Sequence, residues 1–437
     1  MRFRFVHAAD LHLDTPFSGL AQVSEEAASL LRDASIKAFA SVVDLAVERQ
    51  AEFVVLGGDL YDGEQRGVRA QIAFLRGVER LARHGIKTFV VHGNHDPLGG
   101  WSAVRSWPAE VTIFGSDEVS AVQVESDGRV LATVFGLSYG RREVSENLAL
   151  RFPRAGDFGA AQGRLADGGL NIGLLHCSVG DQPEHSSYSP CSLADLTGTC
   201  MDYWALGHIH RAQILRRGEP WVVYPGNTQG RSPKPAELGP KGAMVVEVED
   251  SCVARVDFFP SDAVRFVSLE VDISLLDRDA DVGSLRQELL ARAAGAREEN
   301  PGRALLARVS VTGRGPLHHD LVAPCACEDL LRDLRDEFTG GRPFFWWESL
   351  RDHSRPEVDL DVIRARDDFS SSVLALSETL AQDPDARGRL ARELSPTAPV
   401  GLNRNTEPIC EGDVPDLLED ARALALELLE EEAGSCA

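Results

Sequence analysis

The first half of the chain alternates short apolar runs with longer segments in which apolar residues recur every three or four positions. Continuous apolar runs are typical of strands buried on both faces, and the wider spacing is typical of amphipathic helices. Helices are expected over 24–50 and 65–84, for example. This alternation predicts an α/β sandwich with the helices outside. The expected strands are 3–8, 53–56, 88–91, 112–114, 131–135, 172–175, 204–206, 221–224 and 243–248.

The pattern changes after about residue 262 and predicts a smaller α/β domain. Its expected strands are 266–273, 304–312 and 343–349, and its expected helices are 282–294 and 327–338. From about residue 367 the pattern is helical, with a linker rich in proline, glycine and asparagine over 395–415 and a final acidic helix over 416–432. We therefore predict three regions, 1–262, 263–366 and 367–437.

The final helix carries an apolar stripe at helical spacing, formed by Leu417, Ala421, Leu424 and Leu428. Such a stripe buries itself against something. It could pack on the rest of the chain or dock on a partner, and the sequence favours neither reading.

Composition restricts the class of protein. The chain has 437 residues, of which 43% are hydrophobic and 26% charged, and these values exclude a disordered or fibrous chain. No apolar run is long enough for a transmembrane helix, and the apolar start is too short for a signal peptide. The eight cysteines form no CxxC pair, so reduced thiols and a cytoplasmic location are expected.

The charge balance is strongly acidic, with 68 Asp and Glu against 45 Lys and Arg and a formal net charge of −23. Bulk electrostatics would repel a nucleic acid from such a chain. If the substrate is a polyanion, the attraction must therefore be local.

Five short polar motifs follow apolar strands of the first half. Side chains at the ends of neighbouring strands can converge on one point above a sheet. Together they offer carboxylates, an amide and imidazoles, which are nitrogen and oxygen ligands suited to Mn²⁺, Fe²⁺ or Zn²⁺. The motifs are Asp10-Leu-His12, Gly58-Asp59, Gly93-Asn94-His95-Asp96, His176 and Gly207-His208-Ile209-His210.

The ligand inventory fits two ions, with the carboxylate of Asp59 shared between them. Two ions stabilise the attacking and leaving oxygens of a displacement at phosphorus, and they lower the pKa of bound water. Any one of these motifs is common by chance, but all five in this order are hard to produce without a metal site. One ion would take Asp10, His12 and His210, and the other would take Asn94, His176 and His208.

The motifs DLHLDTP, GGDLYDG, GNHD, LLHCS and GHIH, in this order, resemble the calcineurin-like metallophosphoesterase superfamily. Within it the chain is similar to the SbcD-type nuclease subunits of DNA repair, and the segments ADLHLDTPFSGL and YPGNTQGR look closest to the YhaO-type branch. The resemblance implies a four-layer αββα sandwich with a capping domain, two Mn²⁺ ions and hydrolysis of phosphodiesters. It also implies that the seven residues above are the metal ligands.

The resemblance assigns His95 a role without metal coordination, in stabilising the transition state or protonating the leaving group. Asp96 is expected to orient His95 by accepting its second N–H. Some archaeal and eukaryotic relatives carry a second histidine three residues after the bridging aspartate, where this chain has Asp62. Any role of that histidine in the direction of digestion therefore does not transfer.

The best candidate for binding DNA is the loop 226–241, in which Arg231, Lys234 and Lys241 lie among glycines and prolines. The resemblance further implies a partner, an SbcC-like coiled-coil ATPase, because this chain contains no P-loop of its own. The sequence thus predicts a Mn²⁺-dependent DNA exonuclease or endonuclease. A phosphoesterase acting on nucleotides or small esters, a catalytically silent scaffold and a homodimer all stay open.

Overall fold

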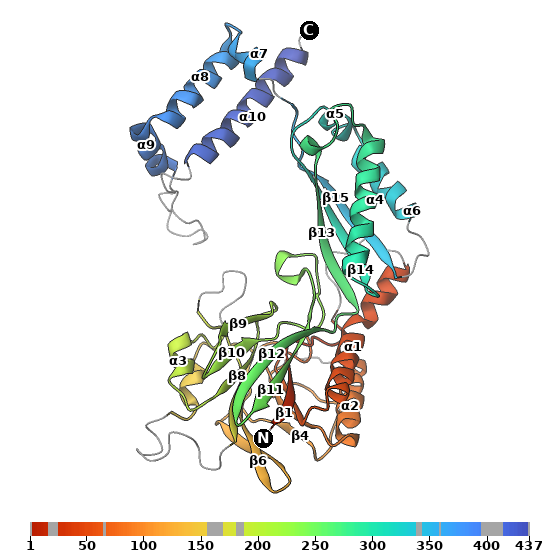
Figure 1. The fold of residues 1–437 in the computed structure, drawn as a ribbon, viewed down its shortest axis with the longest axis vertical. Coiled ribbons are helices and arrows are strands. Elements are labelled where there is room, and N and C mark those ends of the chain that lie inside the picture. Colours follow the sequence, from red (N-terminus) through yellow and green to blue (C-terminus); the bar gives the residue numbers. More distant parts are fainter. Residues whose placement is uncertain are drawn as a thin grey trace. The chain divides into compact units, whose positions relative to one another are not determined.

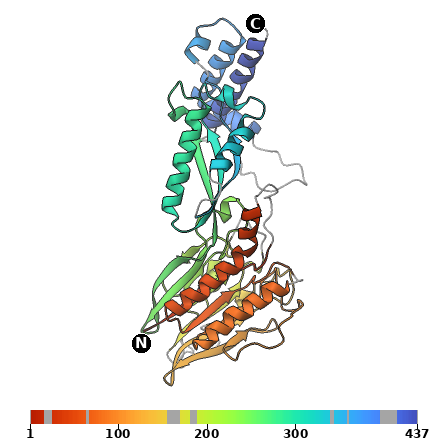
Figure 2. The same cartoon turned by 90° about the vertical axis from the view of Figure 1, so that its right-hand side faces the viewer.

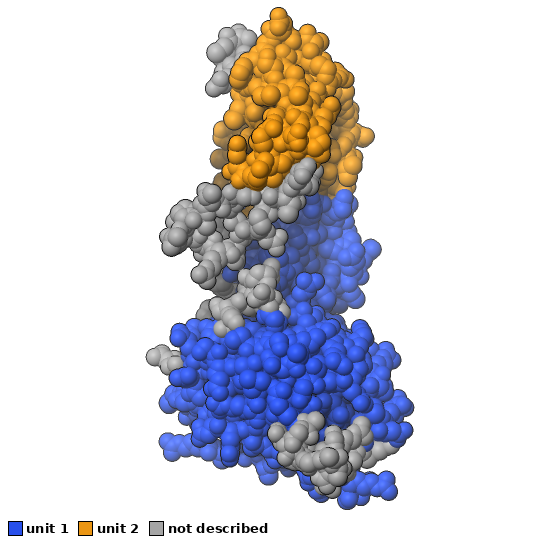
Figure 3. Space-filling model, turned by 90° about the vertical axis from the view of Figure 1, so that its left-hand side faces the viewer, with its two compact units in different colours: residues 1–270, 289–310, 331–350 blue, residues 271–288, 311–330, 351–437 orange. Residues whose placement is uncertain are grey.

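The computed structural model describes residues 2–15, 25–63, 67–154, 169–180, 188–337, 343–357, 360–394 and 414–435. The chain forms two compact units, which Figure 3 shows in different colours. Unit 1 comprises Met1–Glu270, Leu289–Ser310 and Leu331–Leu350. Unit 2 comprises Val271–Glu288, Val311–Leu330 and Arg351–Ala437. The predicted division at residues 262 and 366 stays a prediction.

The first sheet of unit 1 has the strand order β12-β11-β1-β2-β3-β4. The strands β1 to β4 run parallel, whereas β11 is antiparallel to both β1 and β12. Parallel neighbours place their carboxyl ends at one edge of the sheet, and the candidate ligands follow these ends. The strands are β1 (Arg2–Ala8), β2 (Phe53–Gly57), β3 (Lys87–Val91), β4 (Val111–Ile113), β11 (Gly242–Glu249) and β12 (Cys252–Pro260).

The second sheet has the order β5-β6-β7-β8-β10-β9. Its four central strands are parallel, and an antiparallel strand closes each edge. The strands are β5 (Ser120–Ser126), β6 (Arg129–Leu137), β7 (Leu170–His176), β8 (Tyr203–Gly207), β9 (Gln213–Arg216) and β10 (Trp221–Tyr224).

The two sheets pack face to face through an aromatic and aliphatic core. Phe5 and Phe53 stack within the first sheet with ring centroids 4.9 Å apart, and Tyr203 of the second sheet meets Phe5 edge-on at 5.3 Å. The helices α1 (Glu25–Glu48) and α2 (Val68–Arg83) lie side by side over the outer face of the first sheet (Figures 1 and 2).

The outer face of the second sheet is covered by short helices, η1 (Leu148–Arg151) and α3 (Leu193–Thr197). Their side chains Leu148 and Leu196 join the core around Trp204 of β8. The order helix, sheet, sheet, helix confirms the predicted four-layer sandwich.

The strands that the sequence pattern misses are β5, β9 and β12, and all three lie at the edges of their sheets. Edge strands are half-exposed here, so they lack the continuous apolar run by which the buried strands are recognised. The expected strands of the first half all occur, with their ends displaced by at most a few residues.

A third sheet follows, in the order β13-β14-β15, with strands β13 (Val264–Asp272), β14 (Ala304–Thr312) and β15 (Phe345–Asp352). The helices between them are α4 (Val282–Glu299), α5 (His318–Leu321) and α6 (Ala326–Glu337), so the predicted α/β pattern is present. On β15 the side chains of Phe345 and Trp347 are buried.

The last helices are α7 (Leu360–Arg364), α8 (Phe369–Gln382), α9 (Pro384–Leu394) and α10 (Val414–Ser435). Leu426 of α10 is fully buried against Ile363 and Leu374. The predicted stripe faces elsewhere, because Leu417, Leu424 and Leu428 are 39%, 47% and 55% exposed. Most of the predicted linker, residues 395–413, lies outside the described residues. Among the described helices, none has the length and apolarity needed to cross a membrane.

Candidate metal centre

The seven predicted ligands lie at the carboxyl ends of strands from both sheets, and all seven are buried. Three strands of the first sheet and two of the second contribute. Asp10 and His12 follow β1, Asp59 follows β2, Asn94 follows β3, His176 ends β7, and His208 and His210 follow β8.

The backbone around these residues turns sharply. Asp10, Asp59 and His208 have positive φ angles of 52°, 49° and 102°, which side chains other than glycine rarely adopt. A β-carbon at Gly58 would lie 2.6 Å from Nδ1 of His176, and one at Gly93 would lie 2.3 Å from Oδ1 of Asp59. The glycines beside these ligands therefore allow the loops to approach one another.

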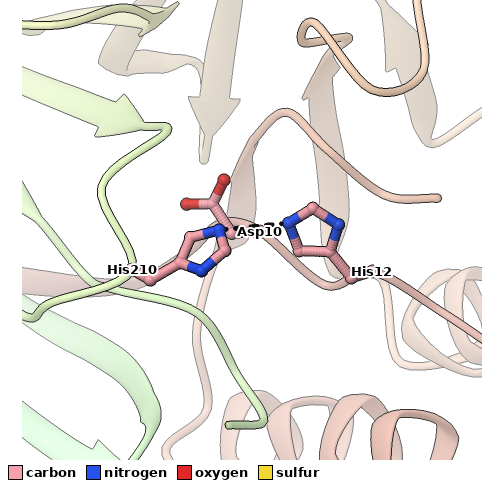
Figure 4. A group of neighbouring side chains, drawn as sticks. All are labelled: Asp10, His12 and His210. Carbon is pink, nitrogen blue, oxygen red and sulfur yellow. Dashed lines mark hydrogen bonds between the residues drawn. The ribbon is translucent and has the colours of Figure 1, made fainter. Parts of the chain in front are cut away.

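One cluster joins Asp10, His12 and His210 (Figure 4). Nδ1 of His210 donates to Glu237 Oε1 at 2.7 Å, so the Nε2 atom of His210 carries a lone pair. That atom lies 3.2 Å from Nε2 of His12, while Nδ1 of His12 is buried without a hydrogen-bond partner. Two buried imidazoles arranged in this way fit a shared cation.

A second cluster joins Asp10, Asp59 and His176. Nδ1 of His176 donates to the carbonyl oxygen of Gly57 at 2.8 Å, which leaves a lone pair on Nε2. This Nε2 atom lies 2.9 Å from Asn94 Oδ1 and 3.5 Å from Asp59 Oδ2. Three buried acceptor atoms that face one another without a proton to share fit a cation and little else.

His208 belongs to neither cluster, although it lies beside both. Its backbone N–H donates to Asp10 Oδ1 at 3.1 Å and to Oδ2 at 3.0 Å. Its ring lies edge-on to that of His176, with centroids 5.2 Å apart. The structure therefore brings the other six predicted ligands together directly and places His208 next to them.

The electrostatics of the cluster also favour a cation. Burial, and then the charge of Asp59, raise the pKa of Asp10 well above its ordinary value. Burial, and then the nearby Arg231 and His210, hold the pKa of His12 well below its ordinary value. Bound cations favour ionised carboxylates and neutral imidazoles, and so they would offset the cost of burying Asp10 beside Asp59.

His95 is half-buried, and its partner differs from the predicted one. Its Nδ1 lies 2.5 Å from Asp62 Oδ1, and its backbone N–H donates to Asp59 Oδ1 at 2.9 Å. Burial lowers the pKa of His95, but the bond to Asp62 and the charges of Asp59 and Asp62 outweigh it, and the net shift is upward. The bond from His95 is the main cause that lowers the pKa of Asp62.

Asp96 braces the loop instead of orienting His95, which corrects the expected role. Its Oδ2 accepts from His92 Nδ1 and from the backbone N–H of Leu60, both at 3.0 Å. Its Oδ1 accepts from the N–H of Gly93 at 2.9 Å. The only sequence signal for Asp62 is its position three residues after Asp59, which the resemblance treated as a departure from some relatives.

The three basic residues predicted to hold DNA differ in their surroundings. Lys241 is buried, and its Nζ donates to the carbonyl oxygens of His210 at 2.9 Å and Ala236 at 2.5 Å. Burial lowers the pKa of Lys241. The prediction that Lys241 contacts DNA is therefore corrected to a structural role, while Lys234 is exposed.

Arg231 lies at the site. Its Nη1 is 3.4 Å from Asp62 Oδ2, its side chain is 25% exposed, and its Nε is buried without a hydrogen-bond partner. A cation with an unused donor beside the ligand cluster is placed to bind an anionic substrate.

Glu237 is a buried carboxylate that no sequence motif singled out. It accepts from His210 Nδ1, from Asn227 Nδ2 at 2.7 Å and from the backbone N–H of Arg231 at 3.2 Å. Burial alone would raise its pKa, but the bond from His210 and the charges of His210 and Lys241 hold the pKa of Glu237 at about 2. Only its place in the loop 226–241 could have drawn attention to it.

Two family models match the chain. The model described as calcineurin-like phosphoesterase matches residues 3–212, which carry every candidate ligand. The model described as the middle domain of metallophosphoesterase YhaO matches residues 266–355.

Three curated proteins are among the relatives of the chain. An uncharacterized metallophosphoesterase, YhaO of Bacillus subtilis (strain 168), is 32% identical over 82% of this chain and 83% of its own length. A DNA double-strand break repair protein Mre11 of Thermoplasma acidophilum is 25% identical over 56% of this chain and 62% of its own. The SbcD component of nuclease SbcCD from Bacillus subtilis is 22% identical over 51% and 61%.

The alignments thus span about three fifths of the Mre11 and SbcD relatives, and most of YhaO. Both the matched models and the long alignment with YhaO point to the same family. The chain belongs to the calcineurin-like metallophosphoesterases, on the YhaO side of that family.

Proposed function

We propose that this metallophosphoesterase is a Mn²⁺-dependent phosphodiesterase acting on DNA, the nuclease component of a complex with an SbcC-like coiled-coil ATPase. The observation that carries the proposal is the group of facing acceptor atoms, His176 Nε2, Asn94 Oδ1 and Asp59 Oδ2. These atoms, with Asp10, His12 and His210, would hold two divalent ions. When bound, such ions polarise a phosphate and lower the pKa of a bound water.

The side chains around the cluster supply the remaining chemistry. Arg231 binds a non-bridging oxygen of the phosphate through its guanidinium group. His95 commits Nδ1 to Asp62, which leaves Nε2 as the ring nitrogen that can give a proton to the departing oxygen. The local positive charge of Arg231 and of the ions draws a polyanion to a chain whose net charge is −23.

The choice of DNA and of the partner rests on weaker support. Two of the relatives are named as a DNA double-strand break repair protein and as part of a nuclease, at 25% and 22% identity. The exposed stripe of α10 (Leu417, Leu424 and Leu428) offers an apolar surface on which a coiled coil could dock. Manganese fits the mixed carboxylate, amide and imidazole ligands.

A second candidate function is hydrolysis of nucleotides or other small phosphoesters by the same cluster. The half-buried site does not by itself distinguish a small ester from a DNA strand. A silent scaffold is disfavoured, because buried acceptor atoms that face one another destabilise a fold unless they bind something.

The test uses the purified full chain with Mn²⁺ and three substrates: duplex DNA, single-stranded DNA and bis-p-nitrophenyl phosphate. The His95→Ala variant is the matched control, because it removes the proton donor and leaves the six clustered ligands in place. Release of nucleotides by the wild type, strongly reduced in the variant, supports the proposal. Turnover of the small ester with intact DNA supports the second candidate, and two bound ions without any turnover support the scaffold.

A further inference from the structure

We infer that Glu237 is a positioning residue that fixes the orientation and tautomer of His210, so that the loop 226–241 sets the affinity of one metal cluster. The inference rests on the proposed metal-dependent function and deepens it. It concerns the cluster of Asp10, His12 and His210, and it leaves the cluster of Asp10, Asp59 and His176 without such a contact.

The bond from His210 Nδ1 to Glu237 Oε1 is 2.7 Å, the length of a strong hydrogen bond to a carboxylate. A histidine whose Nδ1–H is held by a carboxylate presents the lone pair of Nε2 to the opposite side of its ring. In this structure Nε2 of His210 faces His12, inside the cluster. Glu237 thereby selects the tautomer of His210 that can bind a cation.

Glu237 is itself held firmly. Its second oxygen accepts from Asn227 Nδ2 at 2.7 Å and from the backbone N–H of Arg231 at 3.2 Å, and its side chain is buried. A carboxylate with three donors on two oxygens has little freedom to rotate. The orientation of His210 therefore depends on the fold of the loop that carries Glu237.

The same loop holds His210 through its backbone. Nζ of Lys241 donates to the carbonyl oxygen of His210 at 2.9 Å. The side chain and the main chain of this one ligand are thus held by residues four positions apart, on either side of residues 238–240. In contrast, His176 of the other cluster is held by the carbonyl oxygen of Gly57, which lies in β2.

A purely structural role for Glu237 is the alternative, in which the carboxylate only ties the loop together. Its contact with the charge of Arg231 is loose, since Nε of Arg231 lies 4.0 Å from Oε1. The short bond goes to His210 instead. The two readings differ in what they predict for metal binding and for the tautomer of His210.

The experiment compares Glu237→Gln with the wild type in the full chain. The first readout is Mn²⁺ binding, measured by competition with a chelator. Loss of a carboxylate behind a ligating histidine typically weakens metal affinity by about 10- to 100-fold. We expect one of two sites to weaken by that factor while the other keeps its Kd.

The second readout needs no metal. Histidine-selective ¹⁵N NMR of the metal-free protein reports the tautomer of His210, which we expect to be the Nδ1–H form in the wild type and to shift toward the Nε2–H form in Glu237→Gln. Glu348→Gln is the matched control, because Glu348 is a largely buried glutamate of β15 that accepts from Arg308 at 3.0 Å. This control should change neither readout.

Unchanged Mn²⁺ affinity and an unchanged tautomer in a folded Glu237→Gln would overturn the inference. Equal weakening of both sites, together with a lower unfolding temperature in the presence of a chelator, would favour the purely structural role and overturn it as well. A wild type that binds no Mn²⁺ would overturn the proposed function, and the NMR readout would still judge the contact between Glu237 and His210.

Discussion

In the sandwich of β1–β12, a group of polar side chains is buried at the ends of apolar strands, whereas on α10 a group of leucines is left exposed. Both groups go against the usual distribution of residues between core and surface. The sandwich could bury apolar residues at Asp10 and Asp59 at lower cost, and α10 could expose polar residues at Leu424 and Leu428. Each group is therefore better explained by something it binds than by the stability of the chain alone.

The two regions differ in the kind of partner that would satisfy them. At the sandwich, acceptor atoms face one another, and a cation satisfies them. At α10, an apolar surface faces outward while Leu426 on the same helix is buried, so the helix already has its own packing face. The first region calls for an ion and the second for a macromolecule.

The largest effect is expected from Asp59→Asn, which removes the carboxylate common to both halves of the site. Metal analysis should find both ions lost, and hydrolysis should fall by at least about 10³-fold, the scale on which loss of a catalytic group acts. The same change removes the repulsion with Asp10, so the metal-free variant should unfold at a higher temperature than the metal-free wild type. Retention of two ions by Asp59→Asn would contradict the shared position of this carboxylate.

The next effect concerns the proton donor. His95→Ala should keep both ions and lose about 10² to 10⁴ in rate toward esters with poor leaving groups, because general acid catalysis acts on this scale. Toward p-nitrophenyl esters, whose leaving group needs no proton, the loss should be much smaller. A metal-free His95→Ala would show instead that His95 is a ligand.

Asp62→Asn sharpens this prediction, since Asp62 orients His95 through a 2.5 Å contact. The variant should show the same dependence on the leaving group as His95→Ala, but a smaller loss, with kcat changed more than KM. Asp14→Asn is the matched control, because Asp14 is a similarly exposed carboxylate that pairs with Arg69 at 2.9 Å. An equal loss for good and poor leaving groups in Asp62→Asn would argue against this positioning role.

A moderate effect is expected at the basic residues of the loop 226–241. Arg231→Ala should raise KM by about tenfold or more, since a hydrogen bond to a charged group contributes about 1.5–3 kcal/mol. Lys234→Ala, at an exposed position, should change KM by about twofold or less. Steady-state kinetics on single-stranded DNA measures both, and a larger effect at Lys234 than at Arg231 would contradict the assignment.

These predictions show what the sequence could and could not supply. The strands that position the ligands were predictable because they are continuous apolar runs, and each polar motif directly follows one. The edge strands β5, β9 and β12 were missed because their exposed faces interrupt that pattern. Local pattern is therefore informative where burial is complete.

Contacts between loops were beyond the sequence. Asp96 directly follows His95, and proximity along the chain suggested that they interact, yet the tight turn directs Asp96 to His92 and the backbone. The partner of His95 comes from the loop after β2, and the partner of His210 comes from a loop 27 residues further along the chain. The burial of Lys241 likewise depends on the path of that loop, which composition alone does not define.

The smallest intrinsic effect is expected on α10, and it tests the other half of the comparison. Leu424→Glu should leave both hydrolysis of small esters and stability almost unchanged, within about 0.5 kcal/mol, because its side chain is exposed. Leu426→Ala, on the same helix, should cost about 2–5 kcal/mol, because that side chain fills a core. If the stripe docks on an SbcC-like ATPase, Leu424→Glu should still abolish co-elution with that partner in size-exclusion chromatography. Undiminished co-elution would mean that the exposed leucines do not form the interface, and that the comparison with the buried site does not extend to α10.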